Sequence, residues 1–222
     1  MKAEFIDLSH PLADGMAAYP GMGHVTVEAI YNHQASSPLY DHKAGFYLGR
    51  VSLPMNSGTY LDSPFHRYED RRDLAGLPLS MTAGLEGIVL DWDADGSREV
   101  APDIAQAELR GKAVLVRTGW DRYYGTDTYN KGGPWLSNAF AELLAEGEAA
   151  LVGVDFMNVD NTSGDKARPV HTLLLGKDIL IVENLTNLGK LPNAGFRFFT
   201  VPLAIVKGAS FPVRAFAEVQ LK

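Results

Sequence analysis

Two short segments, far apart in the chain, carry the side chains best suited to chemistry. The first, residues 56–66, reads Asn-Ser-Gly-Thr-Tyr-Leu-Asp-Ser-Pro-Phe-His. If its middle is a strand, Tyr60 and Asp62 share one face, because strand side chains alternate. Pro64 cannot donate to a strand ladder, so we expect the strand to end there, with Asp62 and His66 on either side of the turn. The alternative is a surface turn with a solvated carboxylate and imidazole.

The second segment runs from Pro169 to Glu183. Proline is favoured in the first turn of a helix, where its missing amide is not needed, so residues 169–175 are predicted to form a short helix that carries His171 near its start. Residues 179–182 read Ile-Leu-Ile-Val and predict a buried strand with Glu183 at its end. A carboxylate directly after four aliphatic residues is costly unless it is paired or binds a metal. The alternative is a surface glutamate at a strand end.

Together the two segments resemble the metal-site motifs of the cyclase family, the group that includes bacterial kynurenine formamidase and isatin hydrolase. That family writes the first segment as His-x-Gly-Thr-His-x-Asp-x-Pro-x-His. Here the glycine, threonine, aspartate, proline and final histidine stand, while the first two histidines are replaced by Asn56 and Tyr60. In the family, a histidine and a glutamate spaced like His171 and Glu183 complete the site. The resemblance extends to residues 5–12, 114–120 and 151–160, which follow in the family's order.

The resemblance implies the family's chemistry, hydrolysis of an amide or cyclic amide next to an aromatic ring, as in the conversion of N-formylkynurenine to kynurenine and formate. In the relatives a divalent metal lowers the pKa of its bound water, and the hydroxide attacks the carbonyl. By position, Asp62 would be the central carboxylate ligand, and His66 would handle protons beside that water. Glu183 would hold metal and exchange protons with the leaving nitrogen. The resemblance also implies a homodimer or higher homo-oligomer.

The two substitutions change which ion the site could hold. Asparagine offers one neutral oxygen and protonated tyrosine is a poor ligand, so we do not expect a two-zinc site. One ion, zinc or manganese, could bind Asp62, His171 and Glu183. Alternatively, Mn²⁺ or Mg²⁺ could use the oxygen-rich set of Asn56, Asp62 and Glu183. In a third arrangement no metal binds, and Tyr60 donates a hydrogen bond into a pocket formed by Asp62, His66, His171 and Glu183.

These alternatives correspond to different classes of function. The first is a metal-dependent hydrolase, with His66, Glu183 and Tyr60 as catalytic residues and Asp62, His171, Glu183 and Asn56 as metal ligands. The second is a pocket protein that binds a small ligand without turnover. The third is a metal-free lyase or isomerase that uses Asp62, His66, Tyr60 and Glu183 as acid and base.

A loop over residues 118–135 is rich in glycine and holds five aromatic residues, Trp120, Tyr123, Tyr124, Tyr129 and Trp135. Aromatic side chains in such a loop could line a pocket for a small aromatic substrate. They could equally pack on their own domain or on a second subunit. We expect Tyr19, Trp120 and Asp155 to face the substrate.

Composition sets the remaining limits. A chain of 222 residues with 46% hydrophobic and 21% charged residues suits one soluble globular domain, here residues 1–222. The net charge of −7 argues against nucleic acid or an anionic membrane as partner. The absence of cysteine excludes disulfides and thiolate metal sites. The first residues lack the uninterrupted apolar core of a signal peptide, so we expect a cytoplasmic protein.

Strand-like and helix-like patterns along the chain predict the fold class. Strands are expected at residues 4–8, 24–31, 45–53, 86–91, 112–117, 150–155, 179–183 and 198–206. Helices are expected at 102–109, at 136–147 with Ser137 as the cap, and at 169–175. This order favours an α/β domain with a mixed, curved sheet, and the family's layered β/β/α arrangement, partly closed like a barrel, fits it.

Overall fold

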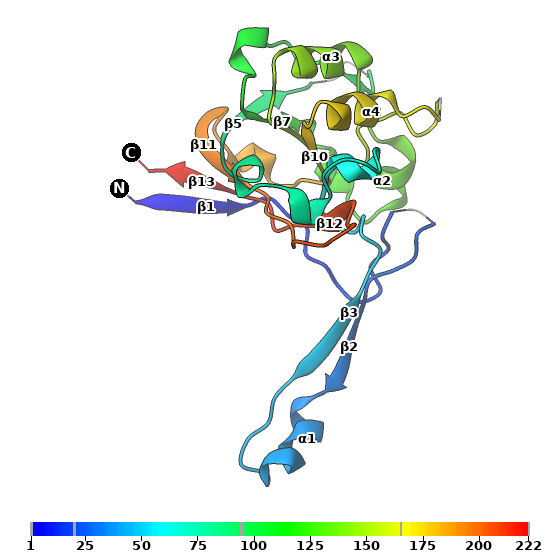
Figure 1. Ribbon diagram of the computed structural model, residues 1–222, viewed down its shortest axis with the longest axis vertical. Helices are drawn as coiled ribbons and strands as arrows, with labels where there is room; N and C mark the ends of the chain where they lie inside the picture. Colours follow the sequence, from blue (N-terminus) through cyan, green and yellow to red (C-terminus); the bar gives the residue numbers. More distant parts are fainter. Residues whose placement is uncertain (1, 20, 94–95, 165, 222) are drawn as a thin grey trace. The chain divides into compact units, whose positions relative to one another are not determined.

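One mixed sheet organises the larger of two units into which the chain divides (Figure 1). The structure is a computed structural model that describes residues 2–19, 21–93, 96–164 and 166–221. The larger unit comprises residues 1–10 and 59–222, and the smaller comprises Pro11–Gly58. Each unit is described by itself below, and the assignment of residues 1–222 to one domain stays a prediction.

The sheet has parallel strands in its centre and antiparallel strands at both ends. Among the described residues its order is β1-β13-β11-β5-β7-β9-β10-β4-β12, and β5, β7, β9 and β10 are parallel. The strand bounds are Ala3–Asp7 (β1), Phe216–Gln220 (β13), Ala194–Phe199 (β11), Ala83–Asp91 (β5), Ala113–Arg117 (β7), Leu151–Val154 (β9), Leu180–Glu183 (β10), Tyr60–Asp62 (β4) and Ser210–Pro212 (β12). The carboxyl ends of parallel strands meet at one edge of a sheet, where ligands bind in open α/β folds. Here that edge holds Glu183 and the residues that follow β7 and β9.

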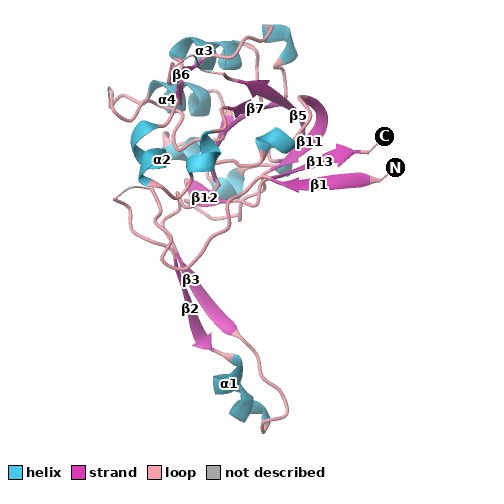
Figure 2. Cartoon of the chain, turned by 180° about the vertical axis from the view of Figure 1, so that it is seen from behind, coloured by secondary structure: helices cyan, strands magenta, loops and turns pink. Residues whose placement is uncertain are grey.

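The two faces of the curled sheet have separate cores. One face closes on itself and buries residues such as Leu61, Leu115 and Phe198. The other face is covered by helices α3 (Asn138–Glu146) and α4 (Pro169–Gly176), which pack over side chains of β7, β9 and β10 (Figure 2). Near-continuous aliphatic runs in the central strands follow from this burial on both faces. The predicted α/β fold with a layered, partly barrel-like sheet is confirmed.

The helix predictions are right in two places and wrong in one. Helix α3 begins after Ser137, whose hydroxyl accepts the amide of Phe140 at 3.0 Å, as the capping pattern predicted. Helix α4 begins at Pro169, as predicted. Residues 102–109 are not an α-helix, because only Gln106–Glu108 form a 3₁₀ turn after an extended Ala105. A segment this short gains too few helical hydrogen bonds to offset nucleation.

The strand pattern was misleading near the C-terminus and missed several elements. Strand β11 ends at Phe199, and residues 201–206 have no strand structure, so the expected strand at 198–206 is wrong beyond its start. Pro202 removes an amide there, and Val201, Leu203 and Val206 are exposed. The sequence analysis also missed β12, β13 and helix α2 (Asp127–Gly132).

The smaller unit contains a β-hairpin and a short helix. Strand β2 (Thr26–Tyr31) pairs antiparallel with β3 (Leu48–Ser52), and helix α1 (His33–Ser36) follows β2. Strands were expected at these two places. In the larger unit, β6 (Glu99–Val100) and β8 (Trp135–Leu136) form a second, minimal pair. None of the described helices is both long and apolar enough to cross a membrane.

Gly153 on β9 tests how tightly the closed face of the sheet is packed. A methyl group added at Gly153 would lie 2.6 Å from Leu185 Cδ1 and 2.7 Å from Leu115 Cδ2. We therefore expect Gly153→Ala to lower the free energy of unfolding by about 1–3 kcal/mol, measured by urea denaturation. The matched control is Gly189→Ala, where the added methyl meets nothing within 4 Å, and we expect a change within about 0.5 kcal/mol. Equal stabilities for the two variants would contradict this description of the core.

Candidate metal centre

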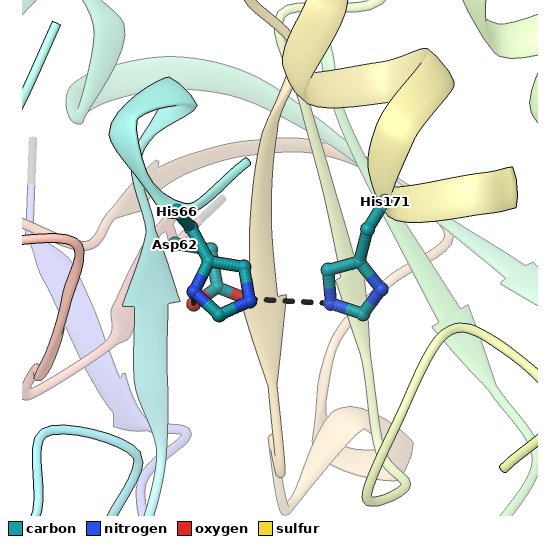
Figure 3. A group of neighbouring side chains, drawn as sticks. All are labelled: Asp62, His66 and His171. Carbon is teal, nitrogen blue, oxygen red and sulfur yellow. Dashed lines mark ion pairs between the residues drawn. The ribbon is translucent and has the colours of Figure 1, made fainter. Parts of the chain in front are cut away.

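Three elements bring the predicted site residues of the larger unit together. Strand β4 pairs with β10 so that Tyr60 lies opposite Glu183 and Asp62 lies opposite Ile181. Helix α4 places His171 above these strands (Figure 3). The Nε2 atom of His171 lies 3.6 Å from Asp62 Oδ2 and 3.6 Å from Glu183 Oε1. The segments 60–66 and 169–183 of the larger unit, distant in sequence, thus share one site.

Asp160 fixes the orientation of His171. Its carboxylate accepts the backbone amides of Val170 at 2.8 Å and His171 at 3.2 Å, so it caps the first turn of α4. It also lies 2.6 Å from Nδ1 of the His171 ring. With Nδ1–H donating to Asp160, the lone pair of Nε2 points at Asp62 and Glu183. A histidine that binds a metal through one nitrogen is usually held in this way through the other.

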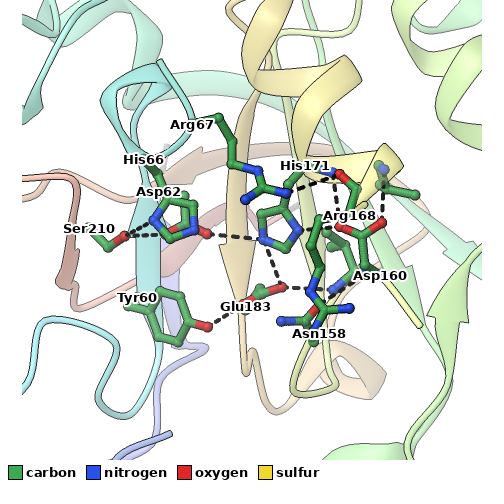
Figure 4. Close-up of polar contacts among 12 residues, drawn as sticks. Tyr60, Asp62, His66, Arg67, Asn158, Asp160, Arg168, His171, Glu183 and Ser210 are labelled. Atoms are coloured by element: carbon green, nitrogen blue, oxygen red, sulfur yellow. Dashed lines mark hydrogen bonds and ion pairs between the residues drawn. The ribbon is translucent and has the colours of Figure 1, made fainter. Parts of the chain in front are cut away.

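The two carboxylates each have one oxygen engaged by a hydroxyl group (Figure 4). The Ser210 hydroxyl donates to Asp62 Oδ1, and the Tyr60 hydroxyl donates to Glu183 Oε2. The other oxygen of Glu183, Oε1, accepts the amide of Val159 at 2.7 Å. The other oxygen of Asp62, Oδ2, is buried and has no hydrogen-bond partner among the described residues. A buried carboxylate oxygen without a donor is costly, and a bound cation would remove that cost.

Two interatomic distances at this site are close to those between ligand atoms of a tetrahedral zinc ion. Ligand bonds of about 2.0–2.1 Å at tetrahedral angles place two ligand atoms about 3.4 Å apart, close to the two 3.6 Å separations around His171 Nε2. His66 lies next to this set, since one ligand atom each from Asp62, His66 and His171 fall within 4.8 Å of one another. Its side chain is 31% exposed, whereas that of Asp62 is 1% exposed. Asp62 and His171 therefore lie where both could bind one divalent cation, whose further protein ligand could be Glu183 or His66, the latter on the solvent side.

Without a cation, protons must balance the buried negative charge. Burial lowers the pKa of His171, but Asp160, Asp62 and Glu183 outweigh it and raise that pKa to about 10. Burial raises the pKa of Glu183 to about 7, against the opposing effect of the His171 charge. Burial disfavours ionised Asp62, yet its contacts with His171, His66 and Ser210 hold its pKa below the usual value. Burial lowers the pKa of His66 despite the nearby Asp62, so this imidazole is neutral at neutral pH.

Asp155 holds the loop that follows β7. Its carboxylate accepts the amides of Thr118 and Gly119 at 2.9 and 2.7 Å and the hydroxyl of Thr118 at 2.6 Å. These contacts connect the carboxyl ends of β7 and β9. In the structure Asp155 therefore positions the start of loop 118–135, and its expected contact with substrate stays a prediction.

The aromatic residues of loop 118–135 pack largely on one another. Tyr124 stacks on His10, with ring centroids 3.5 Å apart, and lies edge-on to Tyr129 at 5.2 Å. The Tyr129 hydroxyl donates to Asn184 Oδ1 at 2.7 Å, directly beside Glu183. Trp120 is half-buried and lies edge-on to Tyr123. His10, Tyr124 and Tyr129, named here the aromatic cluster, thus adjoin the end of β10.

Two of the predicted residues belong to the smaller unit. Tyr19 and Asn56 are both half-buried, and the amide of Tyr19 donates to the carbonyl of Asn56 at 3.3 Å. Their expected roles as substrate contact and metal ligand stay predictions.

The sequence analysis missed two residues that organise the site. Ser210 sits on β12, an element that the strand pattern did not predict, and a lone serine in a short apolar stretch carries no signal. Asp160 lies in a segment that resembles the family, but its role was not foreseen. The combination of Asp160 with Pro169 at a predicted helix start could have indicated a carboxylate cap.

Comparison with known proteins supports membership of the cyclase family. Residues 6–161 match the family model Cyclase, described as "Putative cyclase". Kynurenine formamidase from Bacillus cytotoxicus is 28% identical over 219 residues, which cover 97% of this chain and 98% of the relative. Kynurenine formamidase from Bacillus cereus is 26% identical over 216 residues, covering 96% of each chain.

The fold also matches solved structures. Isatin hydrolase A from Labrenzia aggregata superimposes with a TM-score of 0.85 and 23% identity, covering 98% of this chain and 94% of the other. A predicted metal-dependent hydrolase from Bacillus stearothermophilus superimposes with a TM-score of 0.73 and 19% identity, covering 99% and 100%. At these identities the likeness shows the fold, and the expected family resemblance is confirmed by the family model.

Asp155 gives the site a testable pH dependence. Burial raises its pKa to about 6 in the folded protein, despite the hydrogen bonds from Thr118 and Gly119, against about 3.9 when unfolded. The folded state therefore binds a proton more readily, and the free energy of unfolding should fall by up to about 3 kcal/mol as the pH rises from about 4 to about 6.

Urea denaturation across this pH range should show a shallower decline for Asp155→Asn than for the parent. The control is Asp127→Asn. Asp127 is exposed, and its contact with Lys131 lowers its pKa, so its titration lies below the tested window. If Asp155→Asn shows the parent's decline, the carboxyl group ionises normally in the folded protein.

Proposed function

We propose that this chain, which belongs to the cyclase family, is a metal-dependent hydrolase of non-peptide C–N bonds, acting on an aryl formamide or a related cyclic amide in the manner of kynurenine formamidase. The single observation that carries the proposal is the arrangement of three ligand atoms, Asp62 Oδ2, His171 Nε2 and Glu183 Oε1. Asp62 Oδ2 and Glu183 Oε1 each lie 3.6 Å from His171 Nε2, close to the separation of two ligand atoms on one ion, and Oδ2 lacks a donor among the described residues.

The donor set of one imidazole and two carboxylates suits zinc or manganese. A divalent ion bound there would lower the pKa of a water molecule and polarise a carbonyl group. The protein's own groups would move the protons. His66 is neutral at neutral pH, lies beside Asp62 and reaches solvent, so it can accept a proton from water. Tyr60, bonded to Glu183, holds that carboxylate in place and is the third catalytic candidate.

The substrate we infer is a small aromatic molecule. The aromatic cluster adjoins Glu183 through Asn184, whose side chain accepts the Tyr129 hydroxyl, so aromatic rings lie beside the end of β10. The named relatives are kynurenine formamidases, whose name denotes a formamide substrate. Trp120, Asp155 and Tyr19 remain proposed substrate contacts.

A second candidate, a metal-free lyase or isomerase, is favoured by one observation. The raised pKa of His171, about 10, would keep this imidazole protonated between the two carboxylates in the absence of metal. The separation of 3.6 Å from each carboxylate argues against this arrangement, because a hydrogen bond to an imidazolium would be shorter, near 2.8 Å. A metal-dependent hydrolase therefore accounts better for the two separations of 3.6 Å around His171 Nε2.

We also infer a homodimer or higher homo-oligomer. The hairpin of the smaller unit exposes apolar side chains on its two strands, including Val27, Ile30, Leu48 and Val51. A two-stranded sheet with exposed apolar residues is marginally stable in water and is stabilised by a partner surface. Sedimentation velocity should give a mass at least twice that of one chain, and a monomer at micromolar concentration would contradict this inference. A cytoplasmic location stays a prediction.

The hydrolase proposal is tested by removing the imidazole ligand. We expect His171→Gln to weaken zinc binding by more than about 100-fold, because even a supporting residue is worth 10–100-fold. Turnover of N-formylkynurenine and of simple aryl formamides should fall in parallel, and the parent should lose activity on dialysis against a chelator and regain it with zinc or manganese.

The control is His33→Gln, which changes an exposed histidine of the smaller unit. It should bind zinc and turn over substrate as the parent does. Thermal melting of the metal-free proteins shows whether His171→Gln remains folded. An unchanged activity in the presence of excess chelator would contradict metal dependence and favour the second candidate.

A further inference from the structure

We propose that Ser210 and Tyr60 act as positioning residues that leave Asp62 and Glu183 one oxygen each for a metal, so that the site holds a single ion. This inference rests on the proposed function, since it concerns how the same carboxylates bind the ion. It extends that function to two hydroxyl groups, those of Ser210 and Tyr60, named here the hydroxyl caps.

The first hydroxyl cap is fixed by sheet pairing. Ser210 lies directly opposite Asp62 in the β12–β4 register and is fully buried. Its hydroxyl donates to Asp62 Oδ1, and its oxygen also lies 3.3 Å from His66 Nδ1. With Oδ1 engaged, the oxygen that remains is Oδ2, which faces His171 (Figure 4).

The second hydroxyl cap is also fixed by sheet pairing, here between β4 and β10. Tyr60 lies opposite Glu183 in the β4–β10 register, is 2% exposed, and donates its hydroxyl to Glu183 Oε2. The oxygen that remains toward His171 is Oε1, which also accepts the amide of Val159. Each carboxylate therefore has an outer oxygen bonded to a hydroxyl and an inner oxygen near the imidazole.

This pattern decides how many ions the carboxylates can serve. A carboxylate that bridges two ions through both oxygens needs a free lone pair aimed at each ion, and the hydroxyl hydrogen of each cap is a positive centre that occupies one lone pair of the outer oxygen. The buried ring of Tyr60 also fills space beside Glu183. The neighbouring residues therefore favour one ion bound through Asp62 Oδ2, His171 Nε2 and Glu183 Oε1.

The first test counts the ions bound to the full-length parent. Metal-free protein titrated with zinc in a calorimeter, followed by metal analysis after desalting, should give one ion per chain, and activity should reach its plateau at one equivalent. Electron paramagnetic resonance of the protein loaded with excess Mn²⁺ and desalted should show isolated ions. Two ions per chain, or a spin-coupled manganese pair, would overturn the one-ion inference and leave the hydrolase proposal intact. No bound ion would instead contradict the proposed function.

The second test removes each hydroxyl. We expect Ser210→Ala and Tyr60→Phe each to weaken zinc binding by about 10–100-fold, as loss of a residue that orients a ligand does. The matched controls are Ser63→Ala and Tyr68→Phe, which remove hydroxyls bonded to the backbone carbonyls of Ala209 and Thr172. The controls should keep the parent's zinc affinity.

A spectroscopic measurement separates positioning from general stability. Visible absorption of bound Co²⁺ weakens as its coordination number rises, so the Ser210→Ala spectrum should be weaker if Asp62 then binds through both oxygens. If both hydroxyl variants bind zinc with the affinity of their controls and give the parent's cobalt spectrum, the hydroxyl caps do not position the ligands. Tyr60→Phe keeps the buried ring, so it provides this answer even if Ser210→Ala does not fold.

Discussion

The interaction on which the site depends is the burial of two carboxylates, Asp62 and Glu183, beside a single imidazole. Both side chains are fully buried, and together they place two negative charges within 3.6 Å of His171 Nε2. A low-dielectric interior tolerates such charge only when it is neutralised. A divalent cation would do this directly. Without one, the neighbouring carboxylates outweigh burial and raise the pKa of His171 to about 10, and burial raises that of Glu183 to about 7, so the site takes up protons instead.

The fold supplies the rigidity that this arrangement requires. Asp62 and Glu183 lie on paired strands, β4 and β10, so their separation is set by the sheet register. His171 lies in the first turn of α4, and Asp160 caps that turn while holding the imidazole ring. The Asp160 carboxylate thus caps the start of the helix and also determines which nitrogen of His171 faces Asp62 and Glu183. A site on regular elements with such supporting contacts is held more firmly than a site on loops.

The sequence predicted the parts of the site that local patterns encode. Pro64 and Pro169 marked a strand end and a helix start, and these bracket Asp62, His66 and His171. Ser210 could not be predicted, because its role comes from a strand pairing across 148 residues that no local pattern records. The wrong helix at 102–109 and the wrong strand at 201–206 have the same origin. Apolar residues in both segments suggested regular structure. Leu109 is indeed buried in the core, but the segment that carries it is irregular, and Val206 is exposed.

In the proposed one-ion centre, Tyr60 would preserve the site while lowering the number of ions that it holds. A histidine there would offer a lone pair to an ion, whereas a tyrosine offers a hydrogen to a carboxylate. Tyr60 lies opposite Glu183 in the strand register, and its hydroxyl donates to Glu183 Oε2. The carboxylates of Asp62 and Glu183 together carry two negative charges, which one divalent ion would neutralise. Loss of an imidazole and gain of a phenol are therefore consistent with a smaller, one-ion centre in which the family's aspartate, histidine and glutamate are retained.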